Sequence, residues 1–129
     1  MFTLIPQMPL AADNIESSLK SAIGTAGFIS QVLSYDEAVG CIFNLGDAGR
    51  ALELAINKYH KHQVKDVIKQ IDEAINDVNI CLQSSDVVSR YIADNIVQDI
   101  TNLQLFIKKI KKEASRLGSK VVGSALSPA

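Results

Sequence analysis

The fold is decided by the stretch CIFNLGDAGRALELAINKYHKHQVKDVIKQIDEAINDVNIC, residues 41–81, which begins and ends with a cysteine. Lys61 lies at its centre, twenty residues from Cys41 and twenty from Cys81, inside the polar segment 59–63. If the residues on either side form antiparallel helices, equal distances along the two axes return the cysteines to the same level. The spacing therefore predicts a helical hairpin with neighbouring cysteines.

Both cysteines belong to the apolar stripe of their own helix. Apolar residues recur every three or four positions on each side of the turn, as in an amphipathic helix. The first stripe is Ala38, Cys41, Ile42, Leu45, Ala48, Leu52, Ala55, Ile56 and Tyr59; the second is Val64, Ile68, Ile71, Ala74, Ile75, Val78, Cys81 and Leu82. Two inward-facing cysteines at one level can meet the distance that a disulfide requires, so we predict a Cys41–Cys81 bridge. The alternative is two buried free thiols, because cysteine is a common small core residue.

Composition indicates one helical domain. The chain has 129 residues, enough for a core of its own, and 47% of them are hydrophobic. Prolines occur only at positions 6, 9 and 128, so none interrupts a helix between residues 10 and 127. The net charge of −1 gives no reason to expect nucleic acid as a partner. No apolar run approaches the roughly 20 residues of a membrane span, so we expect no transmembrane segment.

Two further amphipathic segments flank the hairpin. The first helix is expected to begin near Asp13, a good N-cap residue, and to end near Ser34, after which Asp36 and Glu37 open the second helix. The third helix is expected over residues 64–82 and the fourth over 87–117, with Gly118 as its stop. The outer stripes are Ile15, Leu19, Ala22, Ile23, Ala26, Ile29, Val32 and Leu33 in the first helix, and Val88, Ile92, Ile96, Ile100, Leu103, Ile107, Ile110, Ala114 and Leu117 in the fourth.

Four helices with short connections pack as antiparallel neighbours. The sequence therefore predicts an all-α protein, an up-down-up-down four-helix bundle with an inter-helix disulfide, over residues 12–118. Residues 1–11 are expected to form an irregular segment and residues 119–129 a disordered tail. Because the first segment is apolar, we expect it to fold back over the bundle or to mediate self-association.

No pattern of catalytic or metal-binding residues stands out, so we expect neither an enzyme nor a bound cofactor. His60 and His62 flank the turn without carboxylates in a ligand pattern, and we expect solvated side chains rather than metal ligands. No spacing of Ser, His and Asp suggests a nucleophile with its base.

Six of the thirteen cationic side chains fall within residues 108–120. The helix dipole, which favours cations at a helix C-terminus, accounts for most of this clustering, and contact with an anionic surface is the alternative. The six are Lys108, Lys109, Lys111, Lys112, Arg116 and Lys120.

The surroundings of the two cysteines carry a resemblance. Cys41 is followed by Leu45, Asp47-Ala48 and Ala55-Ile56, and Glu73-Ala74 precedes Cys81. This order is similar to that of the plant invertase and pectin methylesterase inhibitors, in which a cysteine, an aromatic residue, an Asp-Ala pair and an Ala-Ile or Ala-Leu pair precede a second cysteine. The likeness covers residues 12–112, and residues 95–107 resemble the closing helix of that family. It implies a bundle in which a disulfide links neighbouring helices of an enzyme inhibitor.

Three departures refine what the resemblance implies. The family begins with a helical hairpin carrying its own disulfide, so we expect a missing upstream segment that also held a signal peptide, and secretion to the apoplast. After Cys81 the family has an acidic-Gly-Phe run, whereas this chain has Leu82-Gln83-Ser84. The invertase-directed branch inserts a Pro-Lys-Phe motif into its target, and Val64-Lys65-Asp66 keeps only the lysine. The resemblance therefore implies a pectin methylesterase target rather than invertase.

The predicted function is that of a protein that occludes the active cleft of a secreted carbohydrate-acting enzyme. Because the inward stripes fill the core, recognition is expected to use outward polar positions on the two disulfide-linked helices. The alternatives are a small helical carrier of an apolar ligand and a lineage-specific secreted interaction protein. The candidate partner-binding residues are Asp47, Arg50, Asn57, Lys65, Lys69 and Asp72.

Overall fold

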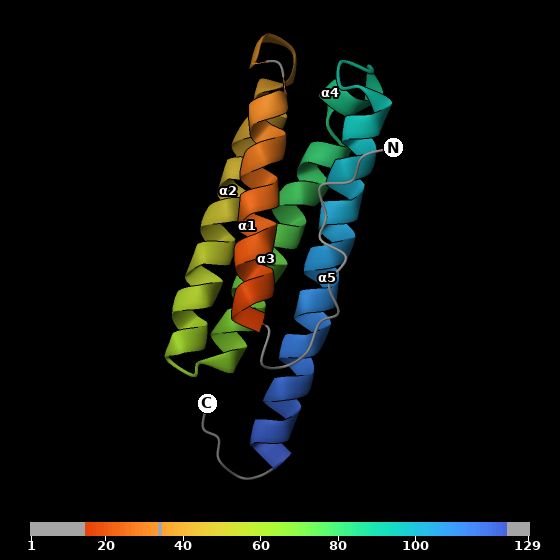
Figure 1. The fold of residues 1–129 in the computed structure, drawn as a ribbon. Helices are drawn as coiled ribbons and strands as arrows, with labels where there is room; N and C mark the ends of the chain where they lie inside the picture. Colours follow the sequence, from red (N-terminus) through yellow and green to blue (C-terminus); the bar gives the residue numbers. More distant parts are fainter. Residues whose placement is uncertain (1–14, 34, 124–129) are drawn as a thin grey trace.

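A computed structural model describes residues 15–33 and 35–123 of the chain, and they form an all-α fold (Figure 1). The elements in order are α1 (Ile15–Val32), α2 (Tyr35–His60), α3 (Val64–Leu82), the single-turn α4 (Ser85–Val88) and α5 (Asp94–Gly123). Each of the four long helices packs against two neighbours, α1 against α2 and α5, and α3 against α2 and α5. Consecutive long helices run in opposite directions (Figure 1), so the predicted up-down-up-down bundle is confirmed.

The turn between α2 and α3 has a defined hydrogen-bond geometry. The Gln63 N–H donates to the Lys58 carbonyl and the His62 N–H to the Tyr59 carbonyl, each at 3.0 Å. This pair of bonds is the Schellman ending of an α-helix, which requires a left-handed residue at its centre. His62 takes that position with φ of 60°. The chain therefore reverses within three residues, and α3 begins at Val64.

The prediction that the last long helix begins at Val87 is wrong. Residues 85–88 form the separate helix α4, which ends in a second Schellman turn: Tyr91 N–H donates to the Asp86 carbonyl and Arg90 N–H to the Val87 carbonyl. Arg90, with φ of 62°, is left-handed, and a right-handed helix cannot continue through such a residue. Val88, expected in the core, is consequently 74% exposed, whereas Ile92 is buried as predicted.

The prediction that Gly118 ends the last helix is also wrong. Helix α5 continues through Gly118 to Gly123, so the predicted tail from residue 119 is helical at its start. Gly118 has a different role: a Cβ added there would lie 2.8 Å from the Val64 Cγ1 atom at the start of α3. Its lack of a side chain lets α5 approach α3. The expectations for residues 1–11, for Asp13 as an N-cap and for residues 124–129 lie outside the described residues.

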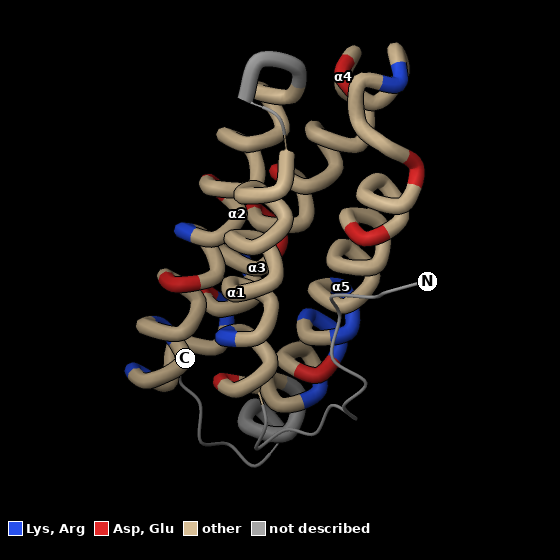
Figure 2. The backbone as a smooth tube through the Cα atoms, turned by 45° about the horizontal axis from the view of Figure 1, so that its top comes forward, with Lys and Arg blue, Asp and Glu red and all other residues tan. Residues whose placement is uncertain are grey.

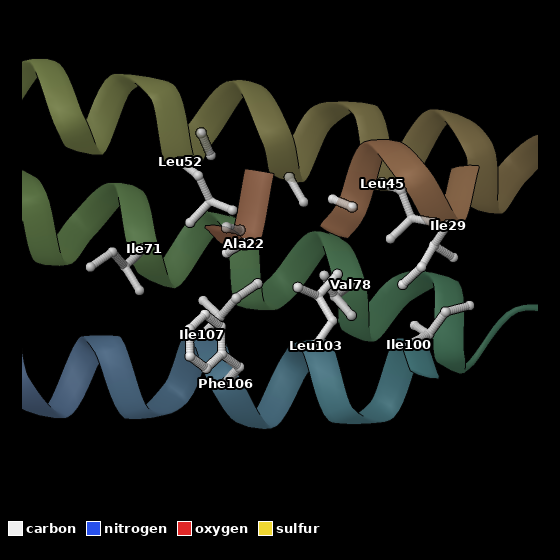
Figure 3. Close-up of a cluster of buried hydrophobic side chains, with 14 of the residues drawn as sticks. Ala22, Ile29, Leu45, Leu52, Ile71, Val78, Ile100, Leu103, Phe106 and Ile107 are labelled. Atoms are coloured by element: carbon white, nitrogen blue, oxygen red, sulfur yellow. The ribbon is translucent and has the colours of Figure 1, made fainter. Parts of the chain in front are cut away.

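The core lies along the common axis of the four long helices. Figure 3 shows side chains from α1, α2, α3 and α5 meeting there, among them Ile29, Leu45, Leu52, Ile71, Val78, Ile100, Leu103 and Ile107. Nearly all predicted stripe positions are buried or half-buried, and Val32, 47% exposed, joins Val88 as an exception. The predicted stripes missed three core residues, Ala51, Val67 and Phe106.

Candidate functional site

A disulfide between Cys41 and Cys81 joins α2 to α3, as predicted. The two Cα atoms are 4.7 Å apart, and both side chains are completely buried. The short turn fixes α2 against α3 at one end of the pair, and the disulfide fixes them near the other. The outward faces of these helices are therefore held in one register.

An open groove of about 890 Å³ runs along the outer surface of the α2–α3 pair, and we call it the α2–α3 groove. Five of the six candidate partner-binding residues line it: Asp47 and Arg50 from α2, and Lys65, Lys69 and Asp72 from α3. The sixth, Asn57, is exposed on α2 but does not line the groove.

Charge is distributed unevenly along the α2–α3 groove. Lys65 and Lys69 lie toward the turn, and among the described residues neither forms an ion pair. Asp47, Glu73 and Asp77 lie toward the disulfide, where Asp47 pairs with Arg50. A partner protein bound in the groove would therefore meet two cations near the turn and a cluster of net negative charge near the disulfide.

The acidic end places Asp77 in an unfavourable setting for a charge. Burial, and after it the charges of Asp47 and Glu73, raises the pKa of the Asp77 carboxyl above its usual range, and the Arg50 guanidinium opposes the rise. Each of these contributions except that of Arg50 penalises the carboxylate. A cationic group placed at this end by a partner would relieve the repulsion.

Asp72 is tied to the neighbouring helix. Its Oδ1 atom lies 2.7 Å from Lys111 Nζ on α5, and both side chains remain substantially exposed. Exposed pairs of this kind contribute about 0–1 kcal/mol to stability. Asp72 therefore lies at the edge of the groove, where it contacts α5 as well as solvent.

Apolar side chains accompany these charges, and sequence reasoning missed them. Leu54 lines the α2–α3 groove and is 47% exposed. Phe43, 59% exposed, lies one helical turn before Asp47, and Ile80, 47% exposed, lies one turn after Asn76. Helical spacing places these residues on the stripes that line the groove. Leu54 lies within the predicted polar stripe, and extending that stripe by one turn reaches Phe43 and Ile80.

A smaller open groove lies between α1 and α2. It measures about 370 Å³ and is lined by Lys20, Ile23, Glu53 and Ile56. None of the candidate partner-binding residues lines it.

The histidines of the turn have ordinary surroundings. His60 Nε2 lies 2.6 Å from Glu16 Oε1, so the pair joins the end of α2 to the start of α1. Hydrogen bonds from Lys20 and from His60 lower the pKa of the Glu16 carboxyl. His62 is exposed at the left-handed turn position. Within residues 15–33 and 35–123, no three His, Cys, Asp or Glu side chains gather in a group that could hold a metal ion.

In the part of the chain that the structure describes, no helix combines the length and apolarity needed to cross a membrane.

No model of a known protein family matches the chain, and neither a curated protein nor a solved structure is significantly similar to it. The helical bundle and its single disulfide agree with the architecture that the inhibitor resemblance implies. The likeness to that family is one of residue order around Cys41 and Cys81.

Proposed function

We propose that this protein is an inhibitor that binds a secreted carbohydrate-acting enzyme through the α2–α3 groove and occludes the active cleft of that enzyme. One observation carries the proposal: five of the six candidate residues line a single groove between two helices that a disulfide cross-links. These residues are outward polar positions on two separate helices, and together they make one continuous surface.

The physical advantage of this surface is preorganisation. Binding loses free energy when flexible side chains and segments become ordered, at about 0.5–1.5 kcal/mol for each immobilised side chain. The Cys41–Cys81 disulfide and the Schellman turn at His62 fix the backbone in advance, so that cost is confined to the side chains. Arg50 and Phe43 are the anchors we propose, because arginine and aromatic side chains supply much of the energy in known interfaces, and Leu54 adds apolar contact area beside them.

The finer assignment is to pectin methylesterase rather than invertase. Lys65 and Asp66 stand where the invertase-directed inhibitors carry the lysine and the inserted aromatic residue of their motif. The Asp66 carboxylate does not suit an apolar insertion, whereas the charged α2–α3 groove suits an enzyme whose cleft accommodates a charged polysaccharide. Secretion accompanies this proposal, since a disulfide persists in oxidising compartments.

The structure gives less support to a carrier of apolar ligands. Both grooves described above are open to solvent, and the larger one is lined mainly by charged and amide side chains. Carrier sites are concave and predominantly apolar.

Charge reversal at Arg50 and Lys69 tests the proposal. The double variant Arg50→Glu with Lys69→Glu should weaken inhibition of a pectin methylesterase by roughly a hundredfold or more, because each reversal replaces an attraction by a repulsion. Its melting temperature should fall by no more than a few degrees, because both side chains are exposed and the reversal at Arg50 removes a surface ion pair with Asp47.

The matched control reverses Lys58 and Lys61, two cations that do not line the α2–α3 groove. This control should inhibit as the wild type does. Equal inhibition by wild type and by the Arg50/Lys69 variant would move the interface to α1 and α5. A wild type that inhibits neither pectin methylesterase nor invertase would remove the inhibitor function.

A further inference from the structure

The second half of α5 carries cations that the fold leaves uncompensated. Lys108, Lys109 and Lys112 are exposed, and among the described residues none of them forms an ion pair. Figure 2 shows Lys and Arg positions gathered on this part of α5, whereas acidic positions mark its first half. Between residues 100 and 118 the sequence has a single acidic residue, Glu113, whose carboxylate lies 2.5 Å from Arg116.

Helical geometry places these cations on one face. Successive residues of an α-helix turn by about 100°, so Lys108, Lys112 and Arg116 follow one another at i, i+4 and i+8 along a single row. Ile107 and Ile110 are completely buried and define the opposite face. The row spans about 12 Å along the axis, and Lys109 lies beside it. We call Lys108, Lys109, Lys112 and Arg116 the α5 cation row.

Lys111 belongs to a different face. It contacts Asp72 on α3, so its charge is already used in the contact between two helices. The α5 cation row and the α2–α3 groove are therefore separate surfaces.

Contrary to the expectation from the sequence, the helix dipole does not account for most of the α5 cation row. Its favourable effect on cations falls off within the last turn of a helix. Helix α5 ends at Gly123, roughly three turns beyond Lys112. Lysines at 108, 109 and 112 consequently gain little from the dipole, while they repel one another at i, i+3 and i+4 spacing. The three lysines of the row therefore lower stability unless an anion lies against them.

We propose that the α5 cation row binds a linear polysaccharide that carries carboxylates. The row is straight and exposed, and neither groove described above includes it, so it suits an extended polyanion rather than a small anion. The disulfide favours an oxidising compartment, where nucleic acid is not the expected polyanion. Anionic lipids are concentrated in the cytoplasmic leaflet, and among the side chains that the structure describes, Leu105 is the one exposed large apolar neighbour of the row for insertion into a bilayer. This second site is independent of the proposed inhibition.

Affinity electrophoresis through gels that contain polygalacturonate tests the proposal. The wild type should be retarded relative to a gel with a neutral polysaccharide, and the retardation should fall steeply with added salt, as for other polyanion complexes. The triple variant Lys108→Gln, Lys109→Gln and Lys112→Gln should bind roughly tenfold more weakly or worse at low ionic strength. It should inhibit its enzyme as the wild type does.

The matched control removes the same charge elsewhere, by Lys20→Gln, Lys58→Gln and Lys61→Gln. Its affinity for polygalacturonate should stay within about twofold of wild type, because a specific row, and not net charge, carries the binding. Equal losses in the two triple variants would overturn the proposal, and so would a wild type that is not retarded by polygalacturonate. Tighter binding to phosphatidylserine vesicles than to polygalacturonate at the same ionic strength would assign the row to a membrane surface instead.

Discussion

Helix α3 packs against α2 on one side and against α5 on the other, and the two pairings are held in different ways. The α2–α3 pair has a three-residue turn and a disulfide between Cys41 and Cys81. The α3–α5 pair is joined by a longer connection that contains α4, and it relies on core packing, on the Lys111–Asp72 ion pair and on the close approach of Gly118 to Val64. One pairing is fixed by local and covalent constraints and the other by tertiary fit. The proposed docking groove lies on the first.

Removing the disulfide should have the largest effect on stability. In the loop-entropy model, closing a loop of about 40 residues stabilises the native state by roughly 4 kcal/mol. The variant Cys41→Ala with Cys81→Ala should therefore lose on the order of 3–4 kcal/mol in urea unfolding while keeping its helix content at low temperature. Reducing agent should lower the stability of wild type and leave the variant unchanged. A loss below about 1 kcal/mol would show that the turn and the core alone hold α2 against α3.

The Gly118 contact offers the corresponding test of the α3–α5 pair. An alanine inside a helix normally gains about 1 kcal/mol over glycine, but a Cβ at this position would meet Val64 Cγ1 at 2.8 Å. We expect Gly118→Ala to destabilise the protein by about 1–2 kcal/mol, because overpacking outweighs the helix propensity.

Two controls belong to this prediction. In a Val64→Ala background the same change should become neutral or stabilising, because the obstructing methyl group is gone. Gly49→Ala, where nothing lies within 4 Å of the added Cβ, should stabilise α2 by up to about 1 kcal/mol. If Gly118→Ala and Gly49→Ala changed stability in the same direction, the close approach of α5 to α3 at Gly118 would be contradicted.

A smaller, stabilising effect is expected at the turn. His62 holds a left-handed conformation that glycine adopts without steric cost. His62→Gly should raise the free energy of unfolding by about 0.5–1 kcal/mol, whereas His62→Ala should change it little. Chemical denaturation of the three proteins measures this directly. A glycine variant less stable than the alanine variant would contradict the left-handed conformation at this position.

The smallest effect concerns Asp77 at the acidic end of the groove. Its pKa is raised in the folded state, so between the ordinary and the raised pKa the native protein binds more protons than the unfolded chain does. Stability contributed by this site is then greatest at low pH and falls as the pH rises through that window. Asp77→Asn should stabilise the protein at pH 7 by a few tenths of a kcal/mol, and the difference should vanish below the ordinary pKa of aspartate. A difference in stability between wild type and Asp77→Asn that is the same at pH 3 and at pH 7 would contradict the penalty on the Asp77 carboxylate.

The contrast between the two pairings also explains what the sequence could predict. The α2–α3 hairpin follows from periodicity and from the equal spacing of Cys41 and Cys81 about Lys61, which are local properties of the chain. Outward polar positions on the same helices were sufficient to find five of the groove residues. No local pattern marks Arg90 as left-handed, so the start of α5 was misplaced.

Gly118 is a second position at which a local sequence pattern led to a wrong prediction. A glycine after an apolar stripe is the usual signal of a helix end. Glycine suits position 118 because α5 passes close to Val64 there, and Val64 lies more than fifty residues away in the sequence. The helical period of the chain does not reveal such a contact. Leu54, Phe43 and Ile80 lie outside the apolar stripes of their helices, so their period marks them as solvent-facing and gives no sign that they accompany the groove.

Hydroxyl-radical footprinting of the protein bound to a pectin methylesterase tests the central claim most directly. If the enzyme docks on the α2–α3 groove, oxidation of Phe43 and Leu54 should fall severalfold in the complex. Phe28 and Leu105, which are 49% and 50% exposed on α1 and α5, provide an internal control and should oxidise as in the free protein. Protection of Phe28 and Leu105 with Phe43 and Leu54 unchanged would contradict the account, and so would a mixture in which no side chain is protected.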